Sequence, residues 1–399
     1  MKRKRVLFVR KNYPVFEDEH AHDDDDVLSD TQAAMAFVES SLVAVEKDDG
    51  EFEYVSGSRE SEFISSLHQL ARRVVMSKDE VAKVVSVGSK RREMFKLKPT
   101  EMIADLIEAF GDMQMLVRHE YPAHRYSPVL KLFLDLQPAA SQITQFFRRS
   151  YDNGSDLILP NKLIRRAMRK LRYMVRIALT HHKTFARNPR KNFSNMIEAM
   201  EDAAECSPRL ASGRIDLFIG SKEHRFKTRH EPPSRAELKE FMGYRRRFIR
   251  YVQNRLKGSL LRMFTKLEYG RDRFFHVHCL ILLNGQHYKD MPGLMDELGA
   301  KWDAITGCTK SFTNVHKLKR RLHYEAIGLV DVRDRRVQIG LQKLASYFTL
   351  ADVFVKLEID EADVETFAIL GPVLKPKPGA YRPVLRMTFR EAVETITYM

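Results

Sequence analysis

Residues 260–284 read LLRMFTKLEYGRDRFFHVHCLILLN, and their pattern indicates a β-hairpin in the C-terminal half of the chain. Two apolar runs, 260–270 and 274–283, are separated by the short charged segment RDR, a pattern typical of two strands joined by a turn. Because side chains two residues apart on a strand point to the same face, we expect His276 and His278 to project side by side. Neutral imidazoles are common metal ligands, so the hairpin predicts a metal site, with two structural histidines as the alternative.

The first strand of this hairpin supplies a carboxylate. Glu268 shares a face with Lys266 if the strand alternates regularly, and it then approaches the two imidazoles from the neighbouring strand. Two histidines and one carboxylate leave positions open on Mg²⁺ or Mn²⁺, and such an ion can grip a phosphate oxygen and polarise the phosphorus. A simple charge at the end of the hairpin is the alternative interpretation of Glu268.

The segments around the hairpin indicate a sheet with helices. Their patterns predict strands at 214–220 and 323–332, and helices at 234–258, 292–306 and 337–357. The first of these helices has the N-cap Ser234, a glutamate three residues later and a glycine at its end. This order predicts an α+β domain over 206–360, in which one antiparallel sheet has helices packed mainly on one face.

Three further segments complete the predicted organisation. Residues 1–60 are expected to be poorly ordered and charged, and His20 and His22 there lie in a solvated acidic loop or, alternatively, a metal-binding tract. Residues 61–205 have apolar side chains at three- and four-residue spacing, which predicts a helical region. Residues 361–399 form a weakly patterned C-terminal tail.

The composition narrows the class of partner. The 399 residues carry a formal net charge of +15, an excess that points to nucleic acid or to an anionic membrane surface. No apolar run reaches the roughly 18 to 20 residues that a membrane span needs, and the basic N-terminus lacks the features of a signal peptide. Cys206, Cys279 and Cys308 are too far apart for a disulfide framework or a zinc finger, which fits a reducing cytoplasm.

Two basic helices are candidates for contacts with DNA phosphates. In the first, 161–192, we expect Leu163, Ala167, Leu171 and Met174 to line one face, with the cations largely elsewhere. The predicted contacts are Arg165, Arg166, Arg169, Lys170 and Arg172 there, and Arg245, Arg246 and Arg247 in the helix 234–258. Lysine and arginine neutralise phosphates without reading sequence, although an ordinary solvated helix face is the alternative.

Tyr347, in the predicted helix 337–357, is the candidate nucleophile. Attack of its phenol on a DNA phosphate gives a 5′-phosphotyrosyl link and frees a 3′-hydroxyl. Lys343, one turn earlier, is placed to favour the ionised phenol. A half-buried structural tyrosine is the alternative interpretation, and Tyr324 is the rival nucleophile.

The residues over 210–360 resemble a known family. The runs LLRMFTKLEYGRDRFFHVHCLILLNGQHY, YEAIGLVDV and ASYFTLADVFVKL resemble the inovirus-type replication proteins of the YagK/YfjJ C-terminal-domain family, which are HUH endonuclease-like. The resemblance assigns the metal-site residues above, and it also assigns Ser346, Asp352 and Lys356 beside Tyr347. It departs from the family at Leu350, where the pattern has a lysine, and Lys343 or Lys356 is the expected substitute.

The resemblance implies a rolling-circle replication initiator. The expected activity is metal-dependent nicking and rejoining of single-stranded or hairpin origin DNA, in the cytoplasm of a bacterial host and alongside host replication proteins. The rival class is a non-catalytic DNA-binding regulator of a phage or prophage on the same fold, which Leu350 favours. A third class, an RNA or protein interaction module, leaves the HVH pair, Glu268 and Tyr347 unexplained.

Overall fold

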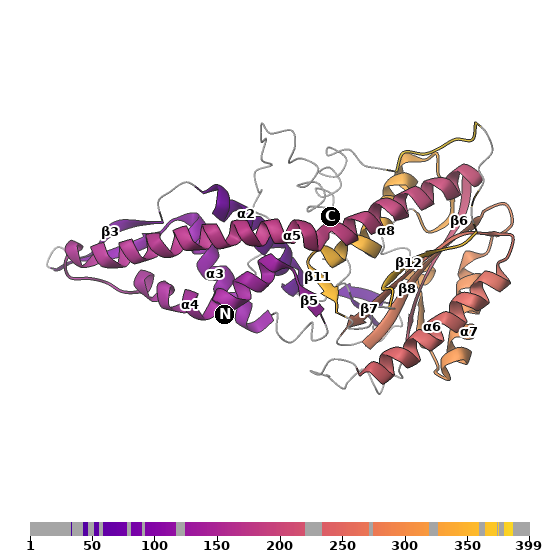
Figure 1. Ribbon diagram of the computed structural model, residues 1–399, viewed down its shortest axis with the longest axis horizontal. Coiled ribbons are helices and arrows are strands. Elements are labelled where there is room, and N and C mark those ends of the chain that lie inside the picture. Colours follow the sequence, from indigo (N-terminus) through magenta and orange to yellow (C-terminus); the bar gives the residue numbers. More distant parts are fainter. Residues whose placement is uncertain are drawn as a thin grey trace.

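The computed structural model has two parts joined by one long helix (Figure 1). It describes residues 33, 43–46, 52–55, 59–77, 81–89, 92–116, 124–219, 234–270, 274–318, 326–358, 364–372, 374 and 379–385. The mainly helical part comes from the N-terminal half, and the second part is built around a sheet from the C-terminal half. The joining helix, α5 (Ile158–Cys206), packs against both parts.

The C-terminal part is an antiparallel sheet, as the hairpin predicted. Its strands are β6 (Arg209–Phe218), β7 (Leu260–Gly270), β8 (Phe274–Asn284), β9 (Phe312–Asn314), β10 (Gly328–Asp331) and β12 (Phe367–Leu370). The strand order is β10-β6-β8-β7-β12, with β9 also paired to β6. The expectation of an unpatterned tail after residue 360 is therefore wrong for β12, which pairs with β7.

Helices cover both faces of the sheet, so the prediction of packing mainly on one face is wrong. Helices α6 (Arg235–Arg255) and α7 (Met291–Thr306) share a core with Val277 and Cys279. Helices α5 and α8 (Arg335–Thr349) share a core with Leu280 and Leu282. The physical reason lies in β8, where both alternating sets of side chains are apolar after His278, a pattern typical of strands buried on both sides.

The expected start of α6 is confirmed, and a side-chain cap also begins α7. Ser234 and Glu237 form a capping box, in which Ser234 Oγ accepts a hydrogen bond from the Glu237 amide at 3.2 Å. Asp290 caps α7 by accepting from the Gly293 amide at 2.9 Å. The predicted helix 337–357 is too long, because α8 ends at Thr349 and a 3₁₀ turn, η5 (Leu350–Val353), leads into the strand β11 (Val355–Leu357).

The N-terminal part contains strands as well as helices. Its helices are α2 (Arg59–Met76), α3 (Glu101–Leu116) and α4 (Pro128–Arg148), in agreement with the helical pattern. The pattern missed a hairpin, β3 (Ala82–Ser89) and β4 (Arg92–Pro99), and a short strand, β5 (His124–Tyr126), that pairs with β11. Within residues 1–60, β1 (Val43–Glu46) pairs with β2 (Phe52–Val55), so the expectation of disorder is wrong there; His20 and His22 lie outside the described residues.

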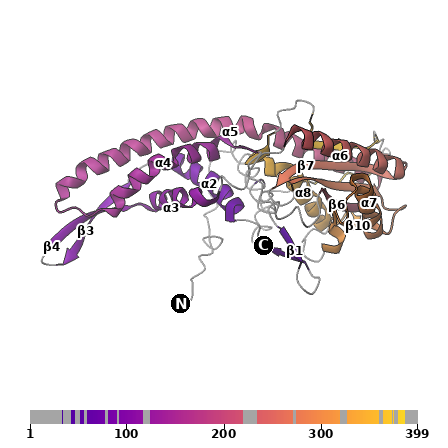
Figure 2. The same ribbon diagram turned by 90° about the horizontal axis from the view of Figure 1, so that it is seen from below.

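Helix α5 crosses the predicted domain boundary at residue 205 and is 49 residues long. Figure 2 shows it running over α2, α3 and α4 and on to the sheet. Its buried face contains Ile164, Met168, Leu171 and Val175, whereas Leu163, expected on that face, is 42% exposed. The helix is therefore confirmed, but its buried face is rotated about the helix axis from the predicted one.

A core substitution tests the packing of α6 and α7 on the sheet. Phe248 is fully buried and its ring meets that of Trp302 edge to face, with 5.7 Å between ring centroids. We expect Phe248→Ala to lower the free energy of unfolding by about 3–5 kcal/mol, because it removes contacts and leaves a cavity. Urea unfolding followed by circular dichroism measures this, and the exposed Arg250→Ala on the same helix is the control, with a change within about 0.5 kcal/mol. A similar small change in Phe248→Ala would contradict the packing.

Candidate metal centre

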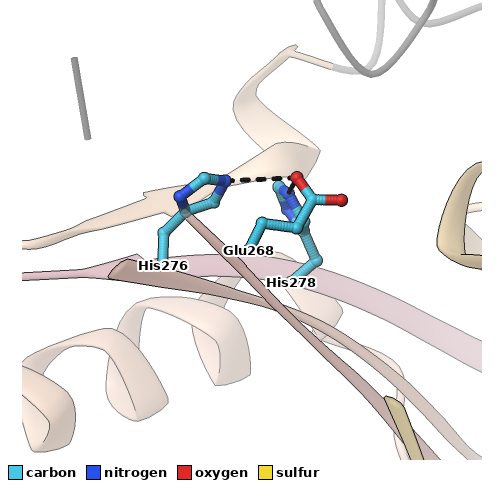
Figure 3. A group of neighbouring side chains, drawn as sticks. All are labelled: Glu268, His276 and His278. Atoms are coloured by element: carbon cyan, nitrogen blue, oxygen red, sulfur yellow. Dashed lines mark hydrogen bonds and ion pairs between the residues drawn. The ribbon is translucent and has the colours of Figure 1, made fainter. Parts of the chain in front are cut away.

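The predicted histidines and glutamate meet on the α5–α8 face of the sheet (Figure 3). Glu268 on β7 lies directly opposite His276 on β8 in the strand register. Its Oε2 lies 3.3 Å from His276 Nε2 and 3.1 Å from His278 Nε2. His276 and His278 are only 8% and 3% exposed, so the three side chains form a nearly buried cluster.

The chemistry of this cluster fits a divalent cation. The three possible ligand atoms of Glu268, His276 and His278 all lie within 4.8 Å of one another. Imidazole nitrogens suit transition metals, and the carboxylate contributes a hard oxygen, so this donor set suits a divalent metal ion. The structure therefore contains a possible metal-binding triad, which was predicted from the sequence.

Two residues that the sequence interpretation did not name support His278 from β6. Asp216 lies opposite His278 in the register, and its Oδ1 is 2.7 Å from His278 Nδ1. Arg214 donates two hydrogen bonds to the same carboxylate, at 3.1 and 3.2 Å. A carboxylate on the far nitrogen of a metal-binding histidine fixes the ring and leaves Nε2 for the metal. The signal was present in RIDLFIG, where charged residues alternate with apolar ones in a strand.

A buried lysine, Lys266, forms an ion pair with the carboxylate of Glu268. Lys266 is 1% exposed, and its Nζ lies 2.9 Å from Glu268 Oε1 and 3.0 Å from Asp352 Oδ1. Asp352 comes from η5, immediately after the helix that carries Tyr347. The ion pairs of Lys266 therefore connect β7, which carries Glu268, to η5, which follows the helix of Tyr347.

The charges around the cluster shift the pKa values of its members. For Glu268, burial raises the pKa, but Lys266 and His278 outweigh burial and hold it well below the usual range. Burial lowers the pKa of His276. For His278, burial acts in the same direction, but Asp216 and Glu268 outweigh it and raise the pKa. The cations Arg214 and Lys266 face the carboxylates of Asp216, Glu268 and Asp352, so each buried cation of the site lies beside at least one carboxylate.

Tyr347 lies beside the triad of Glu268, His276 and His278, as predicted. Its Oη is 3.3 Å from His278 Nε2, and the phenol is only 6% exposed. The guanidinium of Arg214 lies over the ring, 4.2 Å from its centroid. Burial raises the pKa of the phenol above its ordinary value, while the charge of Arg214 opposes that shift.

The charged groups that act most strongly on Tyr347 differ from the two lysines predicted to assist it. The largest charged influences on the phenol come from Arg214, Glu268 and Asp216 rather than from Lys343. The Nζ of Lys356 donates to the carbonyl of Phe185, and it lies 4.2 Å from the centroid of that ring. This carbonyl belongs to the turn before Pro189, which has no N–H to donate, so Lys356 satisfies an orphaned helix acceptor. The contact that the structure shows for Lys356 is therefore structural, and its catalytic role stays a prediction.

The remaining predicted site residues differ in exposure. On α5, Arg165, Arg166, Arg169 and Lys170 are exposed and Arg172 is half-buried. On α6, Arg246 and Arg247 are exposed. Arg245 is only 4% exposed and donates to Thr265 Oγ1 at 2.7 Å and to the Glu365 carbonyl at 2.6 Å, so the prediction that it binds DNA is wrong. Tyr324, the rival nucleophile, lies outside the described residues.

A third histidine approaches the cluster from the N-terminal part. His124 on β5 pairs with Leu357 of β11, a few residues after Asp352. Burial lowers its pKa to about 4, and charges at Glu268, Lys266 and His276 also act on it. His124 therefore stays neutral at physiological pH and brings the helical part into electrostatic reach of the cluster.

Comparison with protein families, with curated proteins and with solved structures found no match for the chain. Among the described residues, no helix is long and apolar enough to cross a membrane.

Titration with Mn²⁺ tests the metal centre. We expect the native chain to bind the ion and to gain about 2.7 kcal/mol of stability at a metal concentration 100 times the Kd. The double variant His276→Ala, His278→Ala is expected to lose both effects, whereas His287→Ala, at an exposed histidine of the same domain, keeps them. Affinity should fall as the pH falls through the raised pKa of His278, because a protonated imidazole cannot bind metal. Calorimetry and thermal unfolding measure both; equal binding by the double variant would exclude this centre.

Replacing the carboxylate behind His278 tests its supporting role. Asp216→Asn should weaken Mn²⁺ binding by roughly 10- to 100-fold, because His278 loses its charged acceptor. It should also lower the free energy of unfolding by about 3–5 kcal/mol, because Arg214 is left as a buried charge without its carboxylate. Asp331→Asn, at an exposed ion pair with Arg333, is the matched control. Unchanged affinity in Asp216→Asn would show that Asp216 does not orient the metal ligand.

Proposed function

We propose that this chain is a metal-dependent single-strand DNA nickase that acts in rolling-circle replication through a phosphotyrosine intermediate. One observation carries the proposal: Tyr347 Oη lies 3.3 Å from the Nε2 of His278, which is also one of the three candidate ligand atoms. A tyrosine beside a cluster of two histidines and a carboxylate is an arrangement suited to phosphoryl transfer. The resemblance to HUH endonuclease-like replication proteins supports the same reaction class.

The proposed reaction transfers a DNA phosphate from a 3′-oxygen to the tyrosine oxygen. The Tyr347 oxygen attacks phosphorus, the bond between phosphorus and the 3′-oxygen breaks, and the phenolic proton ends on the 3′-hydroxyl. Arg214 over the phenol ring stabilises negative charge that develops on the tyrosine oxygen. The reverse reaction, attack by a 3′-hydroxyl on the phosphotyrosine, rejoins the strand without another source of energy.

Three residues would hold the cation in this proposal. Glu268, His276 and His278 supply its protein ligands, and the ion, Mn²⁺ or Mg²⁺, supplies charge neutralisation at the phosphate. Asp216 keeps His278 in the orientation that presents Nε2 to the site. Lys266 keeps Glu268 ionised and in place through the ion pair between them.

A second candidate function is a non-catalytic DNA-binding regulator on the same fold. The observation that favours it is burial: Tyr347 is 6% exposed and the following Leu350 is 1% exposed. A nucleophile must reach its substrate, and a buried phenol with a raised pKa reaches a phosphate only after the surrounding segments move. The two functions differ in whether a covalent adduct forms.

Incubation with labelled single-stranded origin DNA and Mn²⁺ separates these functions. We expect a covalent protein–DNA adduct that forms with the native chain, disappears in Tyr347→Phe and requires the divalent ion. Tyr244→Phe, at a half-buried hydrogen-bonded tyrosine on α6, is the control and should form adduct normally. An adduct that persists in Tyr347→Phe assigns the nucleophile elsewhere, with Tyr324 tested next. Binding without cleavage under any divalent metal supports the regulator.

A further inference from the structure

The outer face of α5 carries a continuous row of cations. Residues 158–197 contain eleven lysines and arginines and no aspartate or glutamate. Nine of the eleven are exposed: Lys162, Arg165, Arg166, Arg169, Lys170, Arg176, Lys183, Arg187 and Lys191. At 100° per residue these nine fall within one side of the helix, opposite the buried face that contains Ile164, Leu171 and Val175. We call this set of nine the α5 stripe.

The α5 stripe lacks the internal neutralisation that surface helices usually have. Six pairs of like charge stand four residues apart in it and around it, such as Arg165 with Arg169, and each costs roughly 0.2–0.5 kcal/mol. In the part of the chain that the structure describes, no ion pair involves Lys162, Arg165, Arg166, Arg169, Lys170 or Arg176. The acidic end of α5 does not compensate, because Glu201 and Glu205 already hold Arg382.

The stripe has the length and form of a backbone-binding surface. From Lys162 to Lys191 it extends about 44 Å, at 1.5 Å per residue. That length equals about 13 base pairs of duplex, whose phosphates follow one another every 3.4 Å along each strand. Tyr173, 65% exposed, lies among the cations and offers a hydroxyl to a phosphate.

The two ends of the stripe have different neighbours. Its C-terminal end lies on the part of α5 where Phe185 contacts Lys356 of β11, next to the segment that carries Asp352. Its N-terminal end lies over the helical part and toward the β3–β4 hairpin, away from the sheet (Figures 1 and 2). A duplex along the stripe is therefore anchored outside the metal centre, at one side of it.

We propose that the α5 stripe binds double-stranded DNA through its phosphates, independently of sequence. This gives the proposed nickase a second, separate contact: the duplex that flanks the strand to be cut. The inference rests on the proposed function only in choosing DNA as the polyanion. Binding by the stripe needs neither the metal nor Tyr347.

Fluorescence anisotropy with a labelled duplex of roughly 30 base pairs tests this binding, in EDTA, so that cleavage plays no part. The stripe variant replaces Lys162, Arg166, Arg169 and Arg176 by glutamine in the full chain. The control variant makes the same charge change at Arg235, Lys239, Arg250 and Lys257, which are exposed on and just after α6. Thermal unfolding and Mn²⁺ affinity, measured on both variants, report whether the fold is kept.

The expected result is specific to the stripe. The native chain should bind with a steep salt dependence between about 50 and 200 mM, and the stripe variant should lose up to about 3.6 in the slope of log K against log salt, or 0.9 for each contact. Its affinity should fall at least about tenfold, with the control variant close to native. Equal losses in both variants would overturn the proposal, because bulk charge would then explain binding. A stripe effect confined to single-stranded DNA, or tighter stripe-dependent binding of duplex RNA, would overturn the assignment to duplex DNA. These outcomes can be interpreted even if the nicking assay fails, because the binding assay contains no divalent metal and needs no cleavage.

Discussion

The register of β8 between β6 and β7 is the constraint on which the site depends. It sets Asp216 and Lys266 on either side of His278 and sets Glu268 beside His276. A slip of one residue would turn the histidines toward α6 and α7 and bring the apolar Val277 and Cys279 onto the site face. Hydrogen-bonded backbone at the centre of a sheet is rigid, so the triad is positioned by strand pairing rather than by loops.

Burial of the charged groups at the site, Arg214 and Lys266, is tolerated because each has an opposite charge within contact. Arg214 meets Asp216, and Lys266 meets both Glu268 and Asp352. Such networks seldom add net stability, because removing the charges from water costs about as much as their attraction returns. An apolar set of side chains would complete this face of the core at no such cost. The retained charges therefore fit a chemical role better than a structural one.

The sequence was sufficient where the signal is local. The hairpin, the HVH pair, Glu268 and the capping box of Ser234 depend on spacing within a few residues, and all were predicted. Arg245 shows a local signal that was misread, because it shares a helix face with Phe241 and Phe248 and is buried with them. The alternating Phe95, Lys96, Leu97 and Lys98 likewise indicated the missed strand β4.

Long-range partners could not be predicted in the same way. Lys356 is separated from the Phe185 carbonyl by 171 positions, and only the folded chain shows that Pro189 leaves this acceptor for it. The contact of Lys356 with α5 also explains why the predicted helix 337–357 stops early. Residues 355–357 adopt a strand, β11, which pairs with β5. The tertiary contact overrides the local helical pattern here.

The positive charge of the chain is divided between two kinds of environment. Around the candidate metal centre, the cations Arg214 and Lys266 are buried and paired with carboxylates. Much of the positive charge that first indicated a polyanion lies on α5, where residues 158–197 contain eleven lysines and arginines and no aspartate or glutamate. In the proposed function, exposed cations would attract DNA, whereas the carboxylates at the triad would bind a metal cation. The exposed cations lie on α5, whereas the triad lies on β7 and β8, and α5 packs against the sheet that carries the triad.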